Sequence, residues 1–383
     1  MGRLACKRLF LRKQTAFMPY RLPLVALLLL GVLLSTVAAC TAEQPLPSGI
    51  PLMSVAASLP PVVADSARYW SMTFDARRPH TPKDIDRMAA LGTTHLTLIP
   101  FGFQAAVDTP AIRMNTDARW HSESDSGIRQ IAREATERGM GLILKPHVWV
   151  GRYDASGQTR ADIGFDAENA WTTWEADYRR FMLHYAALAQ EVDAHVLVVG
   201  TELARAARER PAFWRTLIAE IRARYDGKLT YAGNWHDEYA DVPFWDALDY
   251  IGVQAYFPLT DSADPPGVRE AVAGWDRHVQ ELYDLAVKEE RPVLFTEIGY
   301  RSVSYAGERP WAWPERDEQM PPDEAAQAAL YQSFFERFAE VPWFAGAMFW
   351  KWHPAAEGDR PLAFTPQDKA AEDVLRSGFH RTR

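Results

Sequence analysis

Eight apolar stretches of strand length recur along residues 67–383, and they constrain the fold more than any other feature of the chain. Most of them are apolar on both faces, as expected for parallel strands covered by helices. The predicted strands span residues 70–74, 94–100, 141–149, 196–202, 229–235, 250–257, 292–300 and 344–352.

Helical patterns separate these strands. Residues 81–91 begin with Thr81 as N-cap, Pro82 at the first helical position and Asp84 reaching back. Apolar stripes at helical spacing occupy residues 171–189, 213–225, 272–286 and 325–338. Eight strand–helix units predict an α/β fold, a (β/α)8 TIM barrel that forms one domain over residues 67–383. A doubly wound open sheet is the alternative, but the segment after the first strand lacks the glycine-rich phosphate loop usual there.

The first 40 residues have the pattern of an export signal. Residues 1–21 carry six basic side chains and no acidic one, and the following apolar segment ends in small residues at Cys40. We interpret residues 1–39 as a lipoprotein signal peptide, with translation starting at Met1 or Met18. The segment "VAAC" resembles the lipobox of bacterial lipoproteins, in which the cysteine is acylated. A transmembrane anchor is the alternative, but the apolar run is short for one.

Residues 40–66 are predicted to be the lipidated cysteine and a flexible linker. Residues 41–66 hold five prolines and few charges, which suits a tether between a lipid anchor and a folded domain. Thr41 stands where some inner-membrane lipoproteins have Asp. We therefore expect an exported protein anchored at Cys40, in the outer membrane rather than the inner, facing the periplasm or the exterior.

Loss of residues 1–39 would leave a strongly acidic chain without a free thiol. It removes six positive charges, so the formal charge changes from −8 to −14. Such a charge disfavours nucleic acid and polyanionic partners. We expect a monomer that acts on a neutral substrate.

The active site of such a barrel lies at the C-terminal ends of the strands. Two of the predicted strands carry glutamates there, Glu202 and Glu297. Other side chains predicted at strand ends are Lys145, His147, Trp149, Asn234, Trp235, Tyr256 and Trp350. Two carboxylates among aromatic rings and hydrogen-bond donors suit glycoside hydrolysis, in which one carboxyl is protonated and the other ionised.

Three of these residues could have a structural role instead of a catalytic or binding one. Glu202 and Glu297 could stabilise helix starts, and His147 could be a core histidine. Lys145 follows an apolar strand, where a lysine is rarely buried without a partner, and this favours a role in the site.

Three acidic residues near strand ends, Asp75, Asp237 and Glu238, are interpreted as charges on the rim of the barrel. No His-x-His or HExxH pattern and no phosphate-binding loop occurs, so we expect neither a metal nor a cofactor.

The chain has 14 tryptophans, which is typical of proteins that stack sugar rings. Trp171 fits a helical stripe and is predicted to lie in the core. Trp311 and Trp313 lie in the segment 301–322 and are better candidates for sugar platforms. That segment and residues 101–127 are the two largest insertions at the predicted rim, and neither has a strong strand or helix period.

The blocks "GTEL", "YAGNW", "FWDALDYIGVQAYFPL", "LFTEIGY" and "FWKW" resemble glycoside hydrolase family 113, one of the clan A (β/α)8 retaining glycosidases. The resemblance covers about residues 67–355. It implies that Glu202 is the general acid/base and Glu297 the nucleophile. It also implies that Tyr256 hydrogen-bonds the nucleophile and that Trp350 forms the floor of the −1 sugar site.

The same resemblance implies a neutral oligo- or polysaccharide of the β-1,4-mannan type as substrate. The alternatives are another neutral β-glycan or exopolysaccharide, and a non-catalytic glycan-binding lipoprotein. The chain departs from the clan at Thr201, where many members have an Asn that bonds the sugar 2-OH. Asn234 or Lys145 could supply that bond instead.

Overall fold

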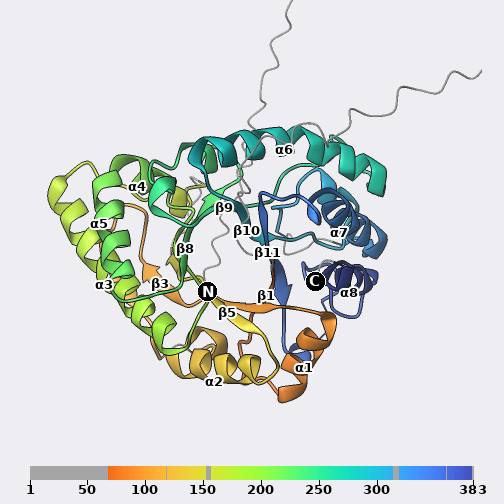
Figure 1. The fold of residues 1–383 in the computed structure, drawn as a ribbon, viewed down its shortest axis with the longest axis horizontal. Coiled ribbons are helices and arrows are strands. Elements are labelled where there is room, and N and C mark those ends of the chain that lie inside the picture. The colour runs from red at the N-terminus through yellow and green to blue at the C-terminus, as the bar shows by residue number, and fades with distance from the viewer. Residues whose placement is uncertain (1–67, 118, 152–156, 314–318, 359, 382–383) are drawn as a thin grey trace, which may run out of the picture. The chain divides into compact units, whose positions relative to one another are not determined.

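Eight parallel strands close into a barrel in the computed structural model, which describes residues 68–117, 119–151, 157–313, 319–358 and 360–381 (Figure 1). The strand order around the barrel is β1-β11-β10-β9-β8-β7-β5-β2. These strands are β1 (Tyr69–Phe74), β2 (His95–Leu98), β5 (Gly141–Leu144), β7 (Val196–Thr201), β8 (Lys228–Asn234), β9 (Tyr250–Gln254), β10 (Val293–Ile298) and β11 (Phe344–Trp352). Each lies within a predicted strand or extends it by one residue, and the predicted barrel is confirmed.

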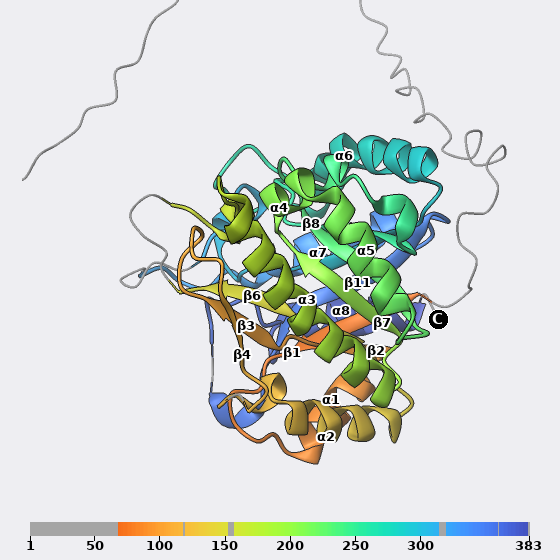
Figure 2. The ribbon, with the colours of Figure 1, turned by 90° about the vertical axis from the view of Figure 1, so that its left-hand side faces the viewer.

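Helices surround the barrel on its outer side (Figures 1 and 2). They are α1 (Pro82–Leu91), α2 (Asp125–Thr136), α3 (Glu168–Glu191), α4 (Ala204–Glu209), α5 (Pro211–Arg222), α6 (Val268–Glu289), α7 (Glu324–Phe338) and α8 (Ala370–Arg381). The predicted start of α1 is confirmed, because the Thr81 backbone N–H and hydroxyl both donate to Asp84 Oδ2, at 2.8 Å each. This capping satisfies groups that a helix start otherwise leaves unpaired.

One of the eight predicted strand–helix units lacks its helix. Only two 3-10 turns, Tyr239–Asp241 and Trp245–Ala247, lie in the described segment between β8 and β9. Pro243 falls between these turns, and a proline inside a helix would remove a backbone hydrogen bond. Phe244 and Trp245 are fully buried, so their rings cover the barrel here in place of a helix.

A second sheet of three short strands extends from one side of the barrel mouth. It consists of β3 (Phe101–Gln104), β4 (Ile112–Met114) and β6 (His147–Val150), in the order β4-β3-β6. The predicted strand 141–149 is therefore two strands, separated at Lys145 and Pro146. Residues 101–127 contain β3 and β4 although they show no strong period, because strands of three or four residues are too short to produce one.

The side chains of the barrel strands alternate between two apolar cores. On β7, Val196 and Val198 belong to a small cluster inside the barrel, whereas Leu197 and Val199 pack against the helices. This alternation follows from the two-residue period of a strand. Trp171 is buried in the outer core, as predicted.

The predictions for residues 1–39, for Cys40 and for the linker 40–66 lie outside the described residues. Within the described part of the chain, no helix has both the length and the apolar character needed to cross a membrane.

Candidate active site

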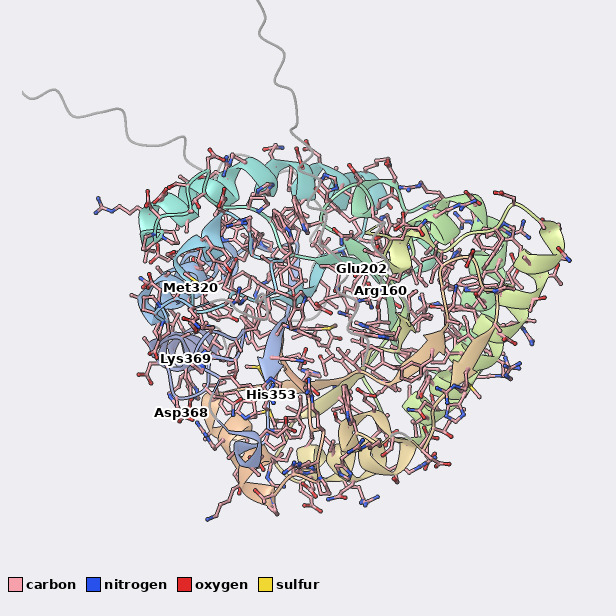
Figure 3. The ribbon with its side chains drawn as sticks, turned by 180° about the vertical axis from the view of Figure 1, so that it is seen from behind. Arg160, Glu202, Met320, His353, Asp368 and Lys369 are labelled. Atoms are coloured by element: carbon pink, nitrogen blue, oxygen red, sulfur yellow. The ribbon has the colours of Figure 1, made fainter. Side chains whose placement is uncertain are left out.

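Glu202 directly follows β7 and faces β8. Its backbone φ of 51° lies in the left-handed region, which is uncommon for a residue other than glycine and is found mainly at turns and functional sites. Asn234, the last residue of β8, donates from Nδ2 to Glu202 Oε1 at 2.9 Å. Arg160 Nε lies 3.5 Å from Glu202 Oε2, and the two labelled residues are neighbours in Figure 3. The carboxylate is thus oriented by an amide on one side and a guanidinium on the other.

Hydrogen bonds among the neighbours of Glu202 fix the two residues that flank its side chain, Leu203 and Asn234. Glu238 accepts from the Tyr231 hydroxyl at 2.6 Å and from the Asn234 backbone N–H at 2.7 Å, and the Leu203 N–H donates to the Tyr231 hydroxyl at 2.8 Å. Glu238 is buried, so its interpretation as a rim charge is wrong. Burial raises the pKa of Glu238 to about 7 even though both donors favour the ionised form.

Replacement of Glu238 by Gln is expected to flatten the pH dependence of stability between about pH 4.5 and 7. In this window the folded chain keeps a proton on Glu238 that the unfolded chain has lost, so the free energy of unfolding falls as the pH rises. The difference from the wild type should total about 3 kcal/mol across the window. Urea unfolding at a series of pH values measures it. Asp237→Asn, which changes an exposed neighbour, is the matched control and should keep the wild-type slope; the same slope in Glu238→Gln would contradict this explanation.

Glu297 lies on β10 and is held by a buried lysine. Lys145 Nζ donates to Glu297 Oε1 at 2.6 Å, and the Tyr256 hydroxyl donates to Glu297 Oε2 at 2.8 Å. Burial alone would raise the pKa of Glu297, but the Lys145 ammonium and the hydrogen bonds lower it below the ordinary value. Glu297 is therefore poised to be ionised.

The ammonium of Lys145, a predicted substrate-binding group, is engaged by the protein itself. Its ammonium has three protons, and these go to Glu297 Oε1, Gln254 Oε1 at 2.7 Å and the Thr296 carbonyl at 2.7 Å. Its side chain is fully buried. These contacts place the ammonium against Glu297, and the contact of Lys145 with a sugar stays a prediction.

The two glutamates belong to one site, because His147 and Arg160 connect them. His147 Nε2 lies 4.0 Å from Glu297 Oε1, and His147 Nδ1 lies 3.0 Å from Arg160 Nη1. Arg160 in turn faces Glu202. No sequence pattern points to Arg160, since it lies in a segment without strand or helix period.

Four predicted aromatic residues lie in two pairs near the strand ends. Trp235 stacks on Trp311, with ring centroids 5.1 Å apart and planes at 28°. Trp350 and Trp313 both face the Lys351 ammonium, at 4.6 and 6.0 Å from their ring centroids. Trp311 is 42% and Trp313 63% exposed, so both offer free ring surface. The two predicted platforms therefore belong to different aromatic pairs.

Trp149 is separate from both pairs. It lies on β6, is 43% exposed, and its ring meets Phe101 edge-on at 6.1 Å.

A further acidic pair lies near Lys351, the residue that follows Trp350. Asp75, just after β1, accepts a short hydrogen bond from Lys351, so it is not a free rim charge. Glu123 is buried nearby, and burial together with the charge of Asp75 raises its pKa to about 8. The sequence did not single out Glu123.

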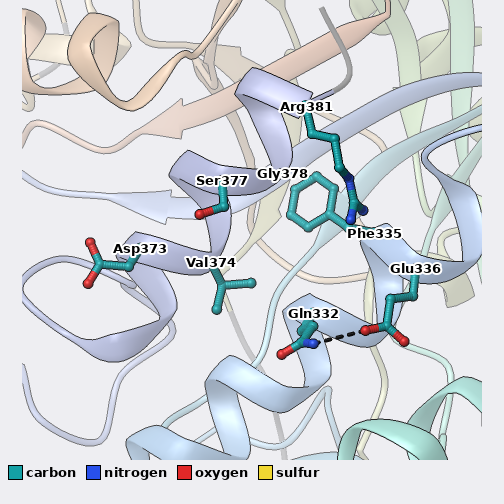
Figure 4. A pocket seen from close by; sticks show the side chains of 8 residues that line it. All are labelled: Gln332, Phe335, Glu336, Asp373, Val374, Ser377, Gly378 and Arg381. Atoms are coloured by element: carbon teal, nitrogen blue, oxygen red, sulfur yellow. Dashed lines mark hydrogen bonds between the residues drawn. The ribbon is translucent and has the colours of Figure 1, made fainter.

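A pocket on the outer surface lies between α7 and α8, where Gln332 donates to Glu336 at 2.9 Å (Figure 4). Its lining contains none of the predicted site residues. No group of three or more potential metal ligands occurs among the described residues.

A closed parallel barrel with two glutamates among aromatic rings at its strand ends is the architecture of a glycoside hydrolase. Residues 69–369 match Glycoside Hydrolase Family 113, and the chain belongs to that family.

Solved structures agree with this assignment. A family 113 β-mannanase from Alicyclobacillus acidocaldarius, in complex with ManMIm, is 28% identical, with a TM-score of 0.70 over 83% of this chain and 99% of that one. A family 113 β-1,4-mannanase is 25% identical, with a TM-score of 0.67 over 82% and 99%. No curated protein sequence matches the chain. The protein is an enzyme that hydrolyses glycosidic bonds.

Proposed function

We propose that this glycoside hydrolase cleaves β-1,4-linked mannan and manno-oligosaccharides with retention of anomeric configuration. The observation that carries the mechanism is the buried contact between Lys145 and Glu297, because it keeps one of the two carboxylates ionised. The substrate rests on the two mannanases to which the chain is similar over nearly their whole length.

In the first step, Glu297 attacks the anomeric carbon while Glu202 gives a proton to the departing glycosidic oxygen. The bond from the anomeric carbon to that oxygen breaks, and a covalent glycosyl ester forms on Glu297. In the second step, Glu202 takes a proton from a water that attacks the same carbon and releases Glu297. Tyr256 and Lys145 hold the nucleophile in place throughout.

Turnover on a panel of β-linked oligosaccharides tests the substrate. The purified protein should cleave the β-1,4-manno series faster than matched cello-, xylo- and β-1,3-gluco-oligosaccharides. The Glu202→Gln/Glu297→Gln double variant serves as the blank for contaminating activity. Faster cleavage of another series would make that glycan the substrate in place of mannan. The proposed two-step mechanism would be unchanged.

Trp311 and Trp313 are expected to act as platforms for sugars beyond the cleavage point. Replacing either by Ala should cost about 1–2 kcal/mol in kcat/KM on long substrates, roughly 5- to 30-fold, because one stacking surface is lost. The loss on a disaccharide should be much smaller. Kinetics on the di- to hexasaccharide series measure both effects, and equal losses at every length would contradict an extended cleft.

We also propose that the protein is exported and anchored through an acylated Cys40. The support is the sequence pattern of residues 1–40. Cys40→Ser is expected to move the protein from the membrane fraction to the soluble fraction, or to block its processing, without changing the catalytic rate of the purified protein. Unchanged partitioning of this variant in a fractionation experiment would argue against lipidation as the anchor.

A further inference from the structure

Arg160 reaches from the 3-10 turn Arg160–Asp162 into the space between the two glutamates. Its side chain is only 17% exposed. Nη1 lies 3.0 Å from His147 Nδ1, and Nε lies 3.5 Å from Glu202 Oε2. Figure 3 labels Arg160 next to Glu202.

The contact with Arg160 determines where His147 carries its proton. A guanidinium has only donors, so the nitrogen that it meets must accept. His147 Nδ1 is therefore unprotonated, and in a neutral ring the proton lies on Nε2. Burial and the charges of Lys145 and Arg160 lower the pKa of His147, which keeps the ring neutral.

The resulting Nε2–H of His147 lacks a partner within the described chain. Nε2 is buried and makes no hydrogen bond there, and Glu297 Oε1, at 4.0 Å, is beyond hydrogen-bond distance. A buried donor without an acceptor destabilises the folded protein, because its hydrogen bond to water is lost and not replaced. A ligand oxygen next to Glu297 would remove that destabilisation.

We propose that Arg160 is a positioning residue that fixes His147 as the neutral Nε2–H tautomer, and that His147 thereby donates a hydrogen bond to a hydroxyl of the sugar attacked by Glu297. The contact between His147 and the sugar rests on the proposed function. His147 supplies a donor that Lys145 cannot provide, because all three Lys145 protons are engaged.

Long-range 1H–15N spectra of the protein labelled with 15N-histidine test the tautomer without any substrate. The His147 signals are identified by their loss in His147→Gln. The wild type should show a protonated Nε2 and a hydrogen-bonded, unprotonated Nδ1. In Arg160→Met the Nδ1 signal should shift, whereas Arg215→Met, which removes an arginine paired with Asp246 on the outer surface, should leave it in place. A proton on Nδ1 in the wild type, or unmoved signals in Arg160→Met, would overturn the proposal.

Kinetics test the consequence for the sugar. Arg160→Met and His147→Gln should each lower kcat/KM about 10- to 100-fold, the loss expected for one hydrogen bond to a charged or buried group. Because Arg160 acts largely through His147, the double variant should lose less than the product of the two single losses. Fully multiplicative losses would overturn this coupling. A wild type that shows the expected tautomer but does not cleave mannan would refute the proposed function and leave the tautomer assignment standing.

Discussion

Glu297→Ala is expected to lower kcat by about 10⁴-fold or more, since removal of a nucleophile eliminates the covalent pathway. Sodium azide should restore part of the turnover on an activated aryl β-mannoside. The azide ion fits the space left by the carboxylate and attacks the anomeric carbon from the same face, so the product should be the inverted α-glycosyl azide. Rates with and without azide, and the configuration of the product, are the measurements.

Glu202→Ala is the matched control for that experiment, because it removes the other glutamate. It should slow substrates with poor leaving groups far more than activated aryl glycosides, which depart with little help from an acid. Its azide product should have the β configuration. Exchange of these two behaviours between the variants would reverse the assigned roles, and an inactive Glu297→Ala that yields no azide product would contradict a double displacement.

Lys145→Met is expected to lower the free energy of unfolding by about 3–5 kcal/mol at neutral pH, because it leaves the buried Glu297 carboxylate without its cation. Without Lys145, burial would raise the pKa of Glu297. The acidic limb of the kcat/KM profile should then move to higher pH. Adding Glu297→Gln should recover much of the lost stability, since it removes the unpaired charge. Denaturant unfolding and pH-rate profiles measure these effects.

Lys369 provides a control for the general cost of losing a buried lysine. Its ammonium donates to the Ser302 hydroxyl and to the carbonyls of Arg360 and Ala363, and none of these partners is a carboxylate. Lys369→Met should be less destabilising than Lys145→Met, and Glu297→Gln should not rescue it. Equal costs, or additive effects of Lys145→Met and Glu297→Gln, would show that the contact does not hold Glu297 ionised.

The contribution of the Lys145–Glu297 pair to the free energy of unfolding of the wild type should depend on pH. Because the folded pKa of Glu297 lies below the ordinary value of 4.5, its contribution to stability is present above that value. The contribution is lost as the pH falls through the folded pKa.

The sequence predicted the barrel and both glutamates because each depends on local patterns. Apolar strands and helical stripes have periods that a single sequence reveals, and the C-terminal end of a parallel strand is a definite place in a barrel. The position of Glu202 and Glu297 at the C-terminal rim of the barrel therefore follows from the sequence pattern alone.

The surroundings of the two glutamates could not be predicted in the same way, because they depend on contacts between distant segments. Lys145 and Glu297 are 152 positions apart in the chain, and the exact partners of the ammonium follow from the packing of three strands. Glu238 is one of two adjacent acidic residues in a loop, and nothing in the local sequence distinguishes the buried Glu238 from the exposed Asp237. Arg160 lies in a turn that no period marks.

The configuration of the first product formed from a β-1,4-manno-oligosaccharide tests the central claim most directly. Proton NMR spectra recorded during the first minutes of hydrolysis, before the sugar ring equilibrates, distinguish the two anomers. Retention by Glu202 and Glu297 predicts that the β-anomer appears first and that the α-anomer follows by mutarotation. Initial formation of the α-anomer would show a single displacement by water and would contradict the assignment of Glu297 as nucleophile.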